Sequence, residues 1–435
     1  MAETADVVVI GAGVIGTAAA LELAKRGLRV VVADKSGGAG FGSTSASSAI
    51  VRFNYSTWDG VATAWESEHC WEKWAEHLEA PADTRLASFV RIGMVMLDVP
   101  PISNASVTAL FDRAGVPYEV WDAATLAGRV PGIDTGRYWP PKRLDDEAFF
   151  AEATEQLGAL FTPDAGFVND PQLAAHNLAD AARARGVVFR FHRVVTSIDQ
   201  RAGRVGGVGL SDGTRIAAPV VVNAAGPWSD SINRMAGVGA EFTVRLRPMR
   251  QEVHQVSAPA GYNGPSGLGP AIADLDLGIY LRPVPPDFLL VGGTEPDCDP
   301  LEWIDDVDAA DPRPTAARFQ AQVTRAARRF PGLLVPNKPT GLSGVYDVTD
   351  DWTPVYDRTD LDGFYVAIGT SGNQFKNAPL AGRFVAALVD GVEGGHDHDR
   401  DPLTYTGEHT GHVIDLGAFS RKRQPNRNSS GTVMG

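Results

Sequence analysis

The chain has 435 residues, of which 44% are hydrophobic and 21% charged, and its formal net charge is −14. This length predicts two domains, and the acidic balance argues against nucleic acid or an anionic membrane as a general partner. The sequence has no apolar run long enough to span a bilayer, no signal-peptide pattern, and no metal or disulfide spacing around Cys70 and Cys298. We therefore expect a soluble cytoplasmic protein without a metal site.

The opening residues carry a pattern typical of dinucleotide binding. An apolar strand, VVVI, leads into Gly11, Gly13 and Gly16, an alanine-rich helix follows, and a second apolar strand ends at Asp34. The glycines allow a tight turn, close approach of backbone amides to a pyrophosphate and close helix–strand packing. Asp34 lies where an acid accepts hydrogen bonds from a ribose hydroxyl. The pattern predicts a bound dinucleotide and leaves open whether it is FAD or NAD.

The remaining elements, in chain order, predict that a second domain interrupts the nucleotide-binding domain. A small-residue loop and an aromatic-rich helix come first, residues 86–98 are strand-like, and residues 170–191 form a helix and a strand. Residues 240–300 alternate apolar and polar positions, which favours an antiparallel sheet. An apolar strand at 364–368 then enters another glycine turn and helix, which repeats the opening unit far along the chain.

We therefore expect an α/β (α+β) fold with a Rossmann-type cofactor-binding domain made from discontinuous segments. The other domain, which would bind the substrate, is expected to contain a large, mainly antiparallel sheet packed on helices. The predicted cofactor-binding segments are 1–90, 160–238 and 335–395, and the predicted substrate-binding segments are 91–159 and 239–334. Residues 396–435 are polar and irregular, and we expect a tail packed on the surface or against a partner.

Four motifs, in this order, resemble those of a known family. They are the fingerprint DVVVIGAGVIG, the loop GSTSASSAIVR, the strand end VVNAAGPWS and the closing segment GFYVAIGTSGNQFKNAP. The chain resembles the FAD-dependent amino acid and amine oxidoreductases of the D-amino acid oxidase superfamily, which include sarcosine oxidase-like and glycine oxidase-like proteins. The resemblance covers nearly the whole chain and implies FAD rather than NAD as the cofactor.

The resemblance and the small residues of these motifs indicate which groups would bind FAD. Loop hydroxyls and amides would reach the pyrophosphate, Val195 would pair with the adenine edge, and the closing loop would place amides near a flavin carbonyl. The residues expected to bind FAD are Gly11, Gly13, Val14, Ile15, Gly16, Asp34, Lys35, Gly42, Ser43, Thr44, Ser45, Val195, Ala225, Gly226, Trp228, Gly369, Gly372, Asn373, Gln374, Phe375 and Lys376.

The resemblance also implies three catalytic residues. Arg52 and Lys376 match the positions of a clamp for the substrate carboxylate, where a guanidinium fork and a second positive charge suit an anion. The alternative is an arginine on the surface and a lysine that extends from a helix start into solvent. Tyr346 matches a tyrosine that lines the substrate pocket, although a core tyrosine is an alternative. Tyr280 and Arg282 are expected on the sheet face toward the flavin.

Some residues depart from the family pattern. Gly344 stands where sarcosine oxidase-like proteins carry the cysteine that tethers the flavin, so we expect FAD to be bound non-covalently. Leu290 stands where a lysine promotes reaction with dioxygen, and Thr294 where a pocket histidine would be. A missing cation should slow reaction with dioxygen, so the electron acceptor is dioxygen or another molecule. His254 could assist deprotonation, but a structural role is the alternative.

These residues favour a flavoenzyme that oxidises the C–N bond of a small amine bearing a carboxylate. The expected substrate is a secondary or N-substituted amino acid, similar to sarcosine or glycine, and hydride transfer would give an imine that hydrolyses. One alternative is a 2-hydroxy-acid dehydrogenase on the same scaffold, and another is a flavin subunit that needs a partner subunit. An NAD-only dehydrogenase is a further alternative function, and a homo-oligomer is an alternative assembly.

Overall fold

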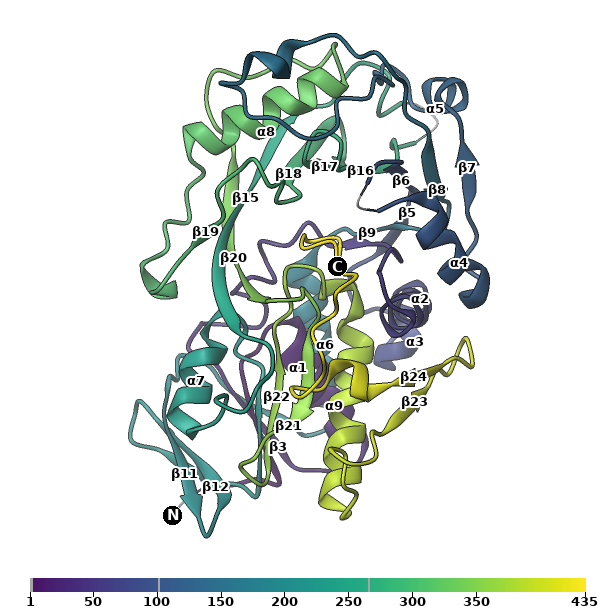
Figure 1. The fold of residues 1–435 in the computed structure, drawn as a ribbon. Helices are drawn as coiled ribbons and strands as arrows, with labels where there is room; N and C mark the ends of the chain where they lie inside the picture. Colours follow the sequence, from purple (N-terminus) through teal and green to yellow (C-terminus); the bar gives the residue numbers. More distant parts are fainter. Residues whose placement is uncertain (1–2, 101, 265–266) are drawn as a thin grey trace.

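A computed structural model of the chain describes residues 3–100, 102–264 and 267–435. Two large sheets organise it. One lies in the lower part of Figure 1 and carries the opening motif, and the other lies in the upper part beneath helix α8 (Ala316–Arg329). This arrangement of mixed sheets and helices agrees with the predicted α/β fold.

The lower sheet is six-stranded and mostly parallel. In spatial order its strands are β10 (Val188–Arg190), β3 (Val30–Ala33), β2 (Val7–Ile10), β14 (Val220–Asn223), β22 (Phe364–Ile368) and β21 (Val355–Arg358). β2 pairs in parallel with β3 and β14, and β22 pairs in parallel with β14. Their continuous apolar runs suit a sheet that is covered on both faces. Segments far apart in sequence thus form one Rossmann-type sheet.

Three helices cover one face of this sheet. Helix α1 (Val14–Lys25) packs between α6 (Pro171–Ala184) and α9 (Ala378–Glu393). A Cβ atom at Gly382 would lie 2.6 Å from the carbonyl oxygen of Ala18, so only glycine permits this approach of α9 to α1. The small residues of both helices therefore allow α1, which follows the turn after β2, to pack closely on α9.

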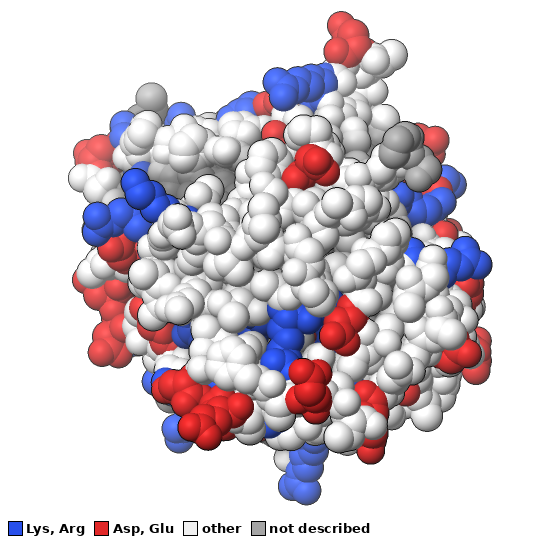
Figure 2. Space-filling view, turned by 90° about the horizontal axis from the view of Figure 1, so that it is seen from above, with Lys and Arg blue, Asp and Glu red and all other residues white. Residues whose placement is uncertain are grey.

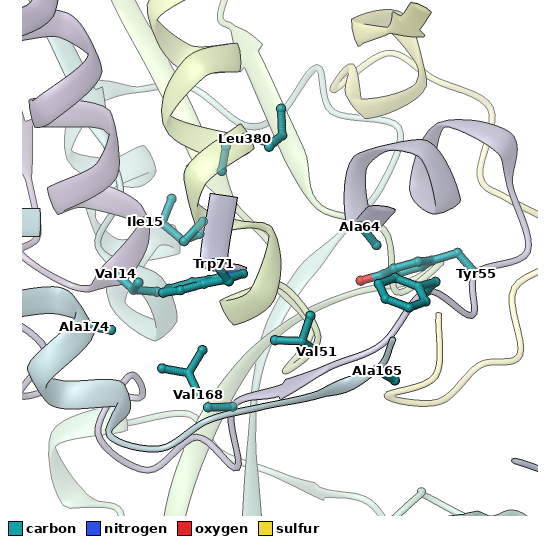
Figure 3. Close-up of a cluster of buried hydrophobic side chains, with 14 of the residues drawn as sticks. Val14, Ile15, Val51, Tyr55, Ala64, Trp71, Ala165, Val168, Ala174 and Leu380 are labelled. Atoms are coloured by element: carbon teal, nitrogen blue, oxygen red, sulfur yellow. The ribbon is translucent and has the colours of Figure 1, made fainter. Parts of the chain in front are cut away.

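A hydrophobic cluster joins these helices to the aromatic-rich helix α2 (Trp58–Glu72). Figure 3 labels ten members of the cluster, among them Val14, Val51, Trp71, Val168 and Leu380. The Trp71 ring stacks on Phe375 with an interplanar angle of 9°, and its Nε1 donates a hydrogen bond of 2.6 Å to the carbonyl oxygen of Lys376. Helix α2 therefore holds the segment that carries Lys376.

The upper sheet is nine-stranded and mainly antiparallel. In spatial order it contains β19 (Glu302–Trp303), β15 (Leu246–Ser257), β18 (Phe288–Gly293), β17 (Ile279–Val284), β16 (Ala271–Asp274), β6 (Met94–Leu97), β8 (Ala159–Thr162) and β7 (Glu119–Trp121), and β20 (Gly341–Thr349) pairs with β15. Helix α8 packs on β15, β17 and β18. This agrees with the antiparallel sheet that the sequence predicts.

Two strands depart from the predicted domain boundaries. β8 and β20 belong to the upper sheet, although the sequence predicts 160–238 and 335–395 as cofactor-binding segments. β20 pairs with β15 from Leu246 opposite Thr349 to His254 opposite Gly341. The pairing partner, which is distant in sequence, decides the sheet to which each strand belongs. The division into domains stays a prediction.

Smaller elements surround the two sheets. The remaining strands are β1 (Glu3–Thr4), β4 (Ile50–Val51), β5 (Phe89–Arg91), β9 (Gly166–Val168), β11 (Val195–Arg201), β12 (Arg204–Leu210), β13 (Arg215–Ala217), β23 (Thr404–Thr406) and β24 (Val413–Asp415). The remaining helices are α3 (Trp74–Leu78), α4 (Asn104–Ala114), α5 (Ala123–Arg129), α7 (Ser229–Ala236) and the 3₁₀ helices η1 (Glu147–Phe150), η2 (Gly226–Trp228), η3 (Val307–Ala309), η4 (Phe375–Asn377) and η5 (Leu416–Phe419).

The C-terminal segment is more ordered than the sequence predicts. It forms the β23–β24 hairpin and η5, and the chain end lies between the upper and lower sheets in Figure 1. Arg421 is fully buried and pairs with Asp357 at 3.0 Å and Asp399 at 2.7 Å. These ion pairs fix the segment against the lower sheet, and it contains regular elements that its polar sequence does not indicate.

The charges do not gather into one patch on the face seen from above. In Figure 2, side chains of both signs lie mostly toward the rim of this face, and uncharged residues fill most of its middle. Within the described ranges, every helix is too short or too polar to cross a bilayer.

Candidate active site

A cavity of about 470 Å³ lies between the two sheets. Its walls come from the turn after β2, the loop after β3, strands β15, β17 and β20, helix η4 and the last residues of the chain. A concave site of this kind between domains is typical of cofactor and substrate binding. The cavity has two ends, one at the opening motif and one at Arg52 and Lys376.

The opening glycines leave no room for a side chain. Gly11 has a φ of +104°, and a Cβ atom there would lie 2.4 Å from the carbonyl oxygen of Ala224. A Cβ atom at Gly16 would lie 2.0 Å from the carbonyl oxygen of Gly11. Gly13 is the N-cap of α1, and the first turn of that helix carries no acidic residue. The helix N-terminus faces the cavity, where the amide of Val14 donates a hydrogen bond of 3.0 Å to the hydroxyl of Thr44, and its partial positive charge favours an anion.

Asp34 is fixed by backbone groups at the same end. Its Oδ2 accepts a hydrogen bond of 2.6 Å from the amide of Ala12, and its Oδ1 accepts one of 2.7 Å from the amide of Ser36. A carboxylate oxygen has two acceptor sites, so each oxygen can accept one more bond, as from a ribose hydroxyl. Together with the glycine turn and the helix N-terminus, this donor and acceptor set fits the adenosine and pyrophosphate half of FAD.

Most of the residues expected to bind FAD line the cavity. The lining residues are Gly11, Gly13, Val14, Ile15, Asp34, Lys35, Gly42, Ser43, Thr44, Val195, Ala225, Gly226, Trp228, Gly372, Asn373, Gln374, Phe375 and Lys376. Gly16, Ser45 and Gly369 are not among them. Gly16 is a packing residue, the exposed Ser45 hydroxyl bonds to the carbonyl of Gly42, and the amide of Gly369 bonds to Asp347. The assignment of these three residues to FAD binding stays a prediction.

The closing loop is held by a buried carboxylate. Asp347 accepts a hydrogen bond of 2.8 Å from the amide of Gly369 and one from the hydroxyl of Thr370. Burial raises the pKa of Asp347, and the bonds from the loop oppose that shift. A Cβ atom at Gly372 would lie 2.3 Å from the ring of Tyr346, so glycine lets the loop pack on that ring. Tyr346 lines the cavity, and burial raises its pKa well above its usual value.

Arg52 and Lys376 converge on the ring of Tyr55. The Arg52 guanidinium carbon lies 5.2 Å and the Lys376 Nζ 4.8 Å from the ring centroid. Both line the cavity, with only 5% and 2% of their surfaces exposed. Arg52 donates to the carbonyl oxygens of Asn54 and Val433, the latter at 2.6 Å, and Lys376 donates to that of Asn373 at 2.6 Å. Within the described ranges neither cation pairs with a carboxylate.

The electrostatics of this pair indicate a site for an anion. Burial lowers the pKa of Arg52, and burial together with the charge of Arg52 lowers the pKa of Lys376 well below its usual value. Two buried cations that share one site are unfavourable unless an anion compensates them. A carboxylate ligand would supply that compensation, and the arginine fork can hold it with two parallel bonds.

The upper sheet contributes the opposite wall. Tyr280 lines the cavity, its hydroxyl lies 2.8 Å from that of Ser48, and burial raises its pKa to about 12. Arg282 is buried over the ring of Phe167, with 4.4 Å from its guanidinium carbon to the ring centroid, and does not line the cavity. Arg282 pairs in register with Leu290.

His254 lies away from the cavity. It is fully buried, packs edge-on against Phe319 of α8 with 5.2 Å between ring centroids, and does not line the cavity. Burial lowers its pKa to about 4, so it is neutral at physiological pH. These facts favour the structural alternative for this residue.

Sequence reasoning missed three residues at the substrate end. Val433 and Met434 line the cavity, and Glu295, which does not itself line it, accepts a hydrogen bond of 2.8 Å from the amide of Val433. Glu295 has a φ of +49°, in the left-handed region that side chains rarely adopt. The only signals in the sequence were the short apolar pair at the chain end and an acid between threonine and proline. Neither indicates a site without the fold.

One group of possible metal ligands lies on α2. Single ligand atoms of Glu68, His69 and Glu72 lie within 4.8 Å of one another. Arg91 already bonds to both glutamates at 3.0 Å, and none of these residues lines the cavity. An arginine in this position suits a surface ion-pair cluster, so we propose no metal site there.

Comparisons with known proteins agree with this geometry. Glycine oxidase from Geobacillus kaustophilus is 28% identical over 90% of this chain and 94% of its own length. D-amino acid dehydrogenase from Paramagnetospirillum magneticum is 26% identical over 88% of this chain and 95% of its length. Sarcosine oxidase subunit beta from an Arthrobacter species is 24% identical over 94% of this chain and 92% of its length.

Solved structures show the same fold. The crystal structure of L-proline dehydrogenase from P. horikoshii matches with a TM-score of 0.72 and 24% identity over 89% of this chain and 94% of its own. The family model described as FAD dependent oxidoreductase, DAO, matches residues 6–388. The glycine turn, Asp34 and the closing loop border the cavity, and the chain belongs to the DAO family of FAD-dependent oxidoreductases.

Proposed function

We propose that this enzyme oxidises the C–N bond of a small amine that carries a carboxylate. The single observation that carries the proposal is the pair of buried cations, Arg52 and Lys376, at the far end of the FAD cavity. The names of the relatives, which include a glycine oxidase, a D-amino acid dehydrogenase and a sarcosine oxidase subunit, support an amino acid substrate. A secondary or N-substituted amino acid, similar to sarcosine or glycine, is the substrate class.

The residues of this chain bind and orient such a substrate. Arg52 holds the carboxylate with its fork once the carbonyl of Val433 has moved aside, and Lys376 adds a second positive charge. The rings of Tyr55 and Tyr346 exclude water, which strengthens these interactions. FAD, when bound, would supply the acceptor for a hydride equivalent from the carbon next to the nitrogen, and the imine product would hydrolyse in water.

The cofactor is proposed to be held non-covalently. Gly344 lines the cavity at the position that carries the tethering cysteine in sarcosine oxidase-like proteins. Cys70 is buried and Cys298 partly exposed, both are free thiols, and neither lines the cavity. Free thiols also suit the reducing compartment expected for a cytoplasmic enzyme. Acid denaturation should therefore release all of the FAD into solution.

The proposed electron acceptor is dioxygen or another molecule, and a partner subunit is an alternative assembly. Leu290 leaves no cation at the position that favours reaction with dioxygen in the resembling proteins, so a different acceptor is as consistent with the chain as dioxygen. The second candidate function is a flavin subunit that works with a partner, which the likeness to sarcosine oxidase subunit beta supports. Oxidase activity that returns only on addition of a second polypeptide would favour this candidate.

Anaerobic mixing with candidate substrates tests the proposal. The FAD-loaded enzyme is mixed with sarcosine, glycine, proline and N-alkyl amino acids, and bleaching of the visible flavin band is followed. We expect bleaching by at least one carboxylated amine and none by the same amine without its carboxylate. Bleaching by 2-hydroxy acids alone would instead favour a hydroxy-acid dehydrogenase.

A further inference from the structure

The end of the chain enters the substrate end of the cavity. Val433 and Met434 line the cavity beside Arg52 and Lys376, and they are 9% and 2% exposed. Asn426 anchors the segment, because its amide donates to Asp351 at 3.0 Å and its side chain donates to the hydroxyl of Ser56 at 2.8 Å. Beyond Asn426, the last residues bond mainly to one another, as in the bond of 3.0 Å from the amide of Gly435 to the carbonyl of Thr432.

One residue of this segment is held at both of its backbone polar groups. The amide of Val433 donates to Glu295 Oε2 at 2.8 Å, and its carbonyl accepts from Arg52 Nη2 at 2.6 Å. Within one residue these groups are joined through N, Cα, C and O, as are the amine and the carboxylate of an α-amino acid. A carboxylate and a guanidinium thus hold Val433 as they would hold a free amino acid.

Only one of the two carboxyl oxygens of Glu295 has a hydrogen-bond partner within the described ranges. Its side chain lies beside Arg52's ligand, Val433, yet its Oε1 has no hydrogen-bond partner within the described ranges. Burial raises its pKa to about 8, the amide of Val433 opposes this shift, and the distant charge of Arg318 adds a smaller opposing effect. An unpaired buried carboxyl costs stability, so such groups gather at functional sites.

We propose that Glu295 and Arg52 form the two ends of an amino acid site, in which Glu295 binds the substrate amine and Val433 takes the place of the substrate until it is displaced. This proposal rests on the proposed function and extends it from the carboxylate to the amine. Residues 432–435 move out when the substrate enters, and Asn426 keeps the rest of the segment in place.

The assignment gives the amine proton a destination. When Glu295 is ionised, a substrate ammonium donates to its free Oε1, the N–H bond breaks, and an O–H bond forms on the carboxylate. The amine that remains is neutral, so its lone pair can assist the loss of hydride from the neighbouring carbon. A carboxyl whose pKa is raised toward that of an amine accepts this proton at less cost than an exposed one.

Two ligands that cannot be oxidised separate the amine from the carboxylate. 2-Aminoisobutyrate carries both groups but no hydrogen on Cα, and isobutyrate carries the carboxylate alone. Calorimetry on the full-length FAD-loaded enzyme measures both affinities, and hydrogen–deuterium exchange measures the release of residues 432–435. We expect 2-aminoisobutyrate to bind at least about tenfold more tightly, as a bond to a charged group predicts, and to accelerate exchange of these residues.

Two variants test whether Glu295 causes the preference for 2-aminoisobutyrate. Glu295→Gln keeps an acceptor for the amide of Val433 but loses the charge, so we expect the preference for 2-aminoisobutyrate to fall about tenfold while isobutyrate binds unchanged. Glu302→Gln is the matched control, because this half-exposed glutamate of the upper sheet is bonded to Arg250 and not to Val433. A chain that ends at Gly431 should bind both ligands more tightly, since no segment competes with them.

Three results would overturn the proposal. They are unchanged exchange at 432–435 while 2-aminoisobutyrate binds, an unchanged preference in Glu295→Gln, and absence of binding to both the full chain and the chain that ends at Gly431. The proposed function fails in a different assay, when hydroxy acids bleach the flavin and amines do not. The two failures are therefore distinguishable.

Discussion

The two ends of the cavity are built in different ways. At the cofactor end, Gly11 and Asp34 belong to one continuous strand–helix–strand unit, and backbone amides and a helix terminus make most of the site. At the substrate end, Arg52, Glu295 and Val433 come from segments far apart, and the Arg52–Val433 bond spans 381 positions of the chain. The first end is set by backbone geometry and the second by side chains that only the fold brings together.

This difference predicts that substitutions at the two ends have different effects on cofactor binding and substrate binding. Changes to backbone geometry at the glycine turn should remove the cofactor, and with it every activity. Changes to side chains at the substrate end should leave FAD in place and alter only which molecule binds, and how tightly. Variants at each end test this difference.

The largest effect is expected at Gly16. A Cβ atom there would lie 2.0 Å from the carbonyl oxygen of Gly11, so Gly16→Val must push α1 away from the turn. Overpacking of this kind costs about 3 kcal/mol, and we expect the purified protein to lose both its FAD and its activity. Flavin absorbance and the melting temperature measure the result. The control is Gly128→Ala, where nothing lies within 4 Å of the added atom; a fully FAD-loaded Gly16→Val protein would contradict the prediction.

The next effect is expected at Arg52. Arg52→Gln removes the fork that the carboxylate needs, so we expect kcat/KM for carboxylated amines to fall about 100-fold while FAD stays bound. The preference for these amines over amines without a carboxylate should fall equally. Steady-state kinetics on both kinds of amine measure this, with Arg215→Gln as the control because Arg215 is an exposed arginine paired with Asp199. Equal losses for both kinds of amine would show that Arg52 is not the carboxylate ligand.

How far the sequence could predict each end follows from the same difference. Gly11 and Asp34 were predictable because their roles depend on neighbours within one short unit, where residue spacing determines geometry. Gly369 marks the limit of that reasoning, because the motif predicts the turn but does not indicate that its amide bonds to Asp347, 22 positions away. A local pattern can identify a turn without showing which atoms of the turn face the cavity.

The substrate end was predictable only in part. Arg52 and Lys376 were found through the family resemblance, because neither their composition nor their spacing indicates a shared site. Glu295 was missed, since its role depends on Val433, a contact across 138 positions. The C-terminal segment is held by the buried ion pairs of Arg421. No pattern in that polar stretch indicates with which carboxylates Arg421 pairs.

A smaller effect, with a defined pH dependence, is expected at Lys376. Burial, with the charge of Arg52, holds the pKa of Lys376 well below its usual value in the free enzyme. A bound carboxylate favours the protonated lysine, so binding takes up a proton, and affinity should fall as pH rises above the pKa of the free enzyme. Lys376→Met should weaken isobutyrate binding about tenfold at a pH where both the lysine of the unsubstituted enzyme and the carboxylate of isobutyrate are charged, and it should remove this pH dependence.

Calorimetry in buffers of different ionisation enthalpy measures the proton uptake at Lys376. The same titration on Arg215→Gln serves as the control, because this exposed arginine lies outside the cavity and its loss leaves Arg52 and Lys376 in place. A pH dependence that persists unchanged in Lys376→Met would assign the proton to another group of the cavity.

The smallest effect is expected at Lys35, a charged side chain of the cofactor end. Its Nζ lies 3.8 Å from the ring centroid of Trp228 and pairs with Asp308, and its side chain is 33% exposed. A partly exposed cation of this kind contributes about 0.5–1 kcal/mol, so Lys35→Gln should weaken FAD binding only about two- to fivefold. Fluorescence titration of the apoprotein with FAD measures the change. A loss as large as that of Gly16→Val would mean that side chains, and not backbone geometry, hold the cofactor, and the contrast between the two ends would disappear.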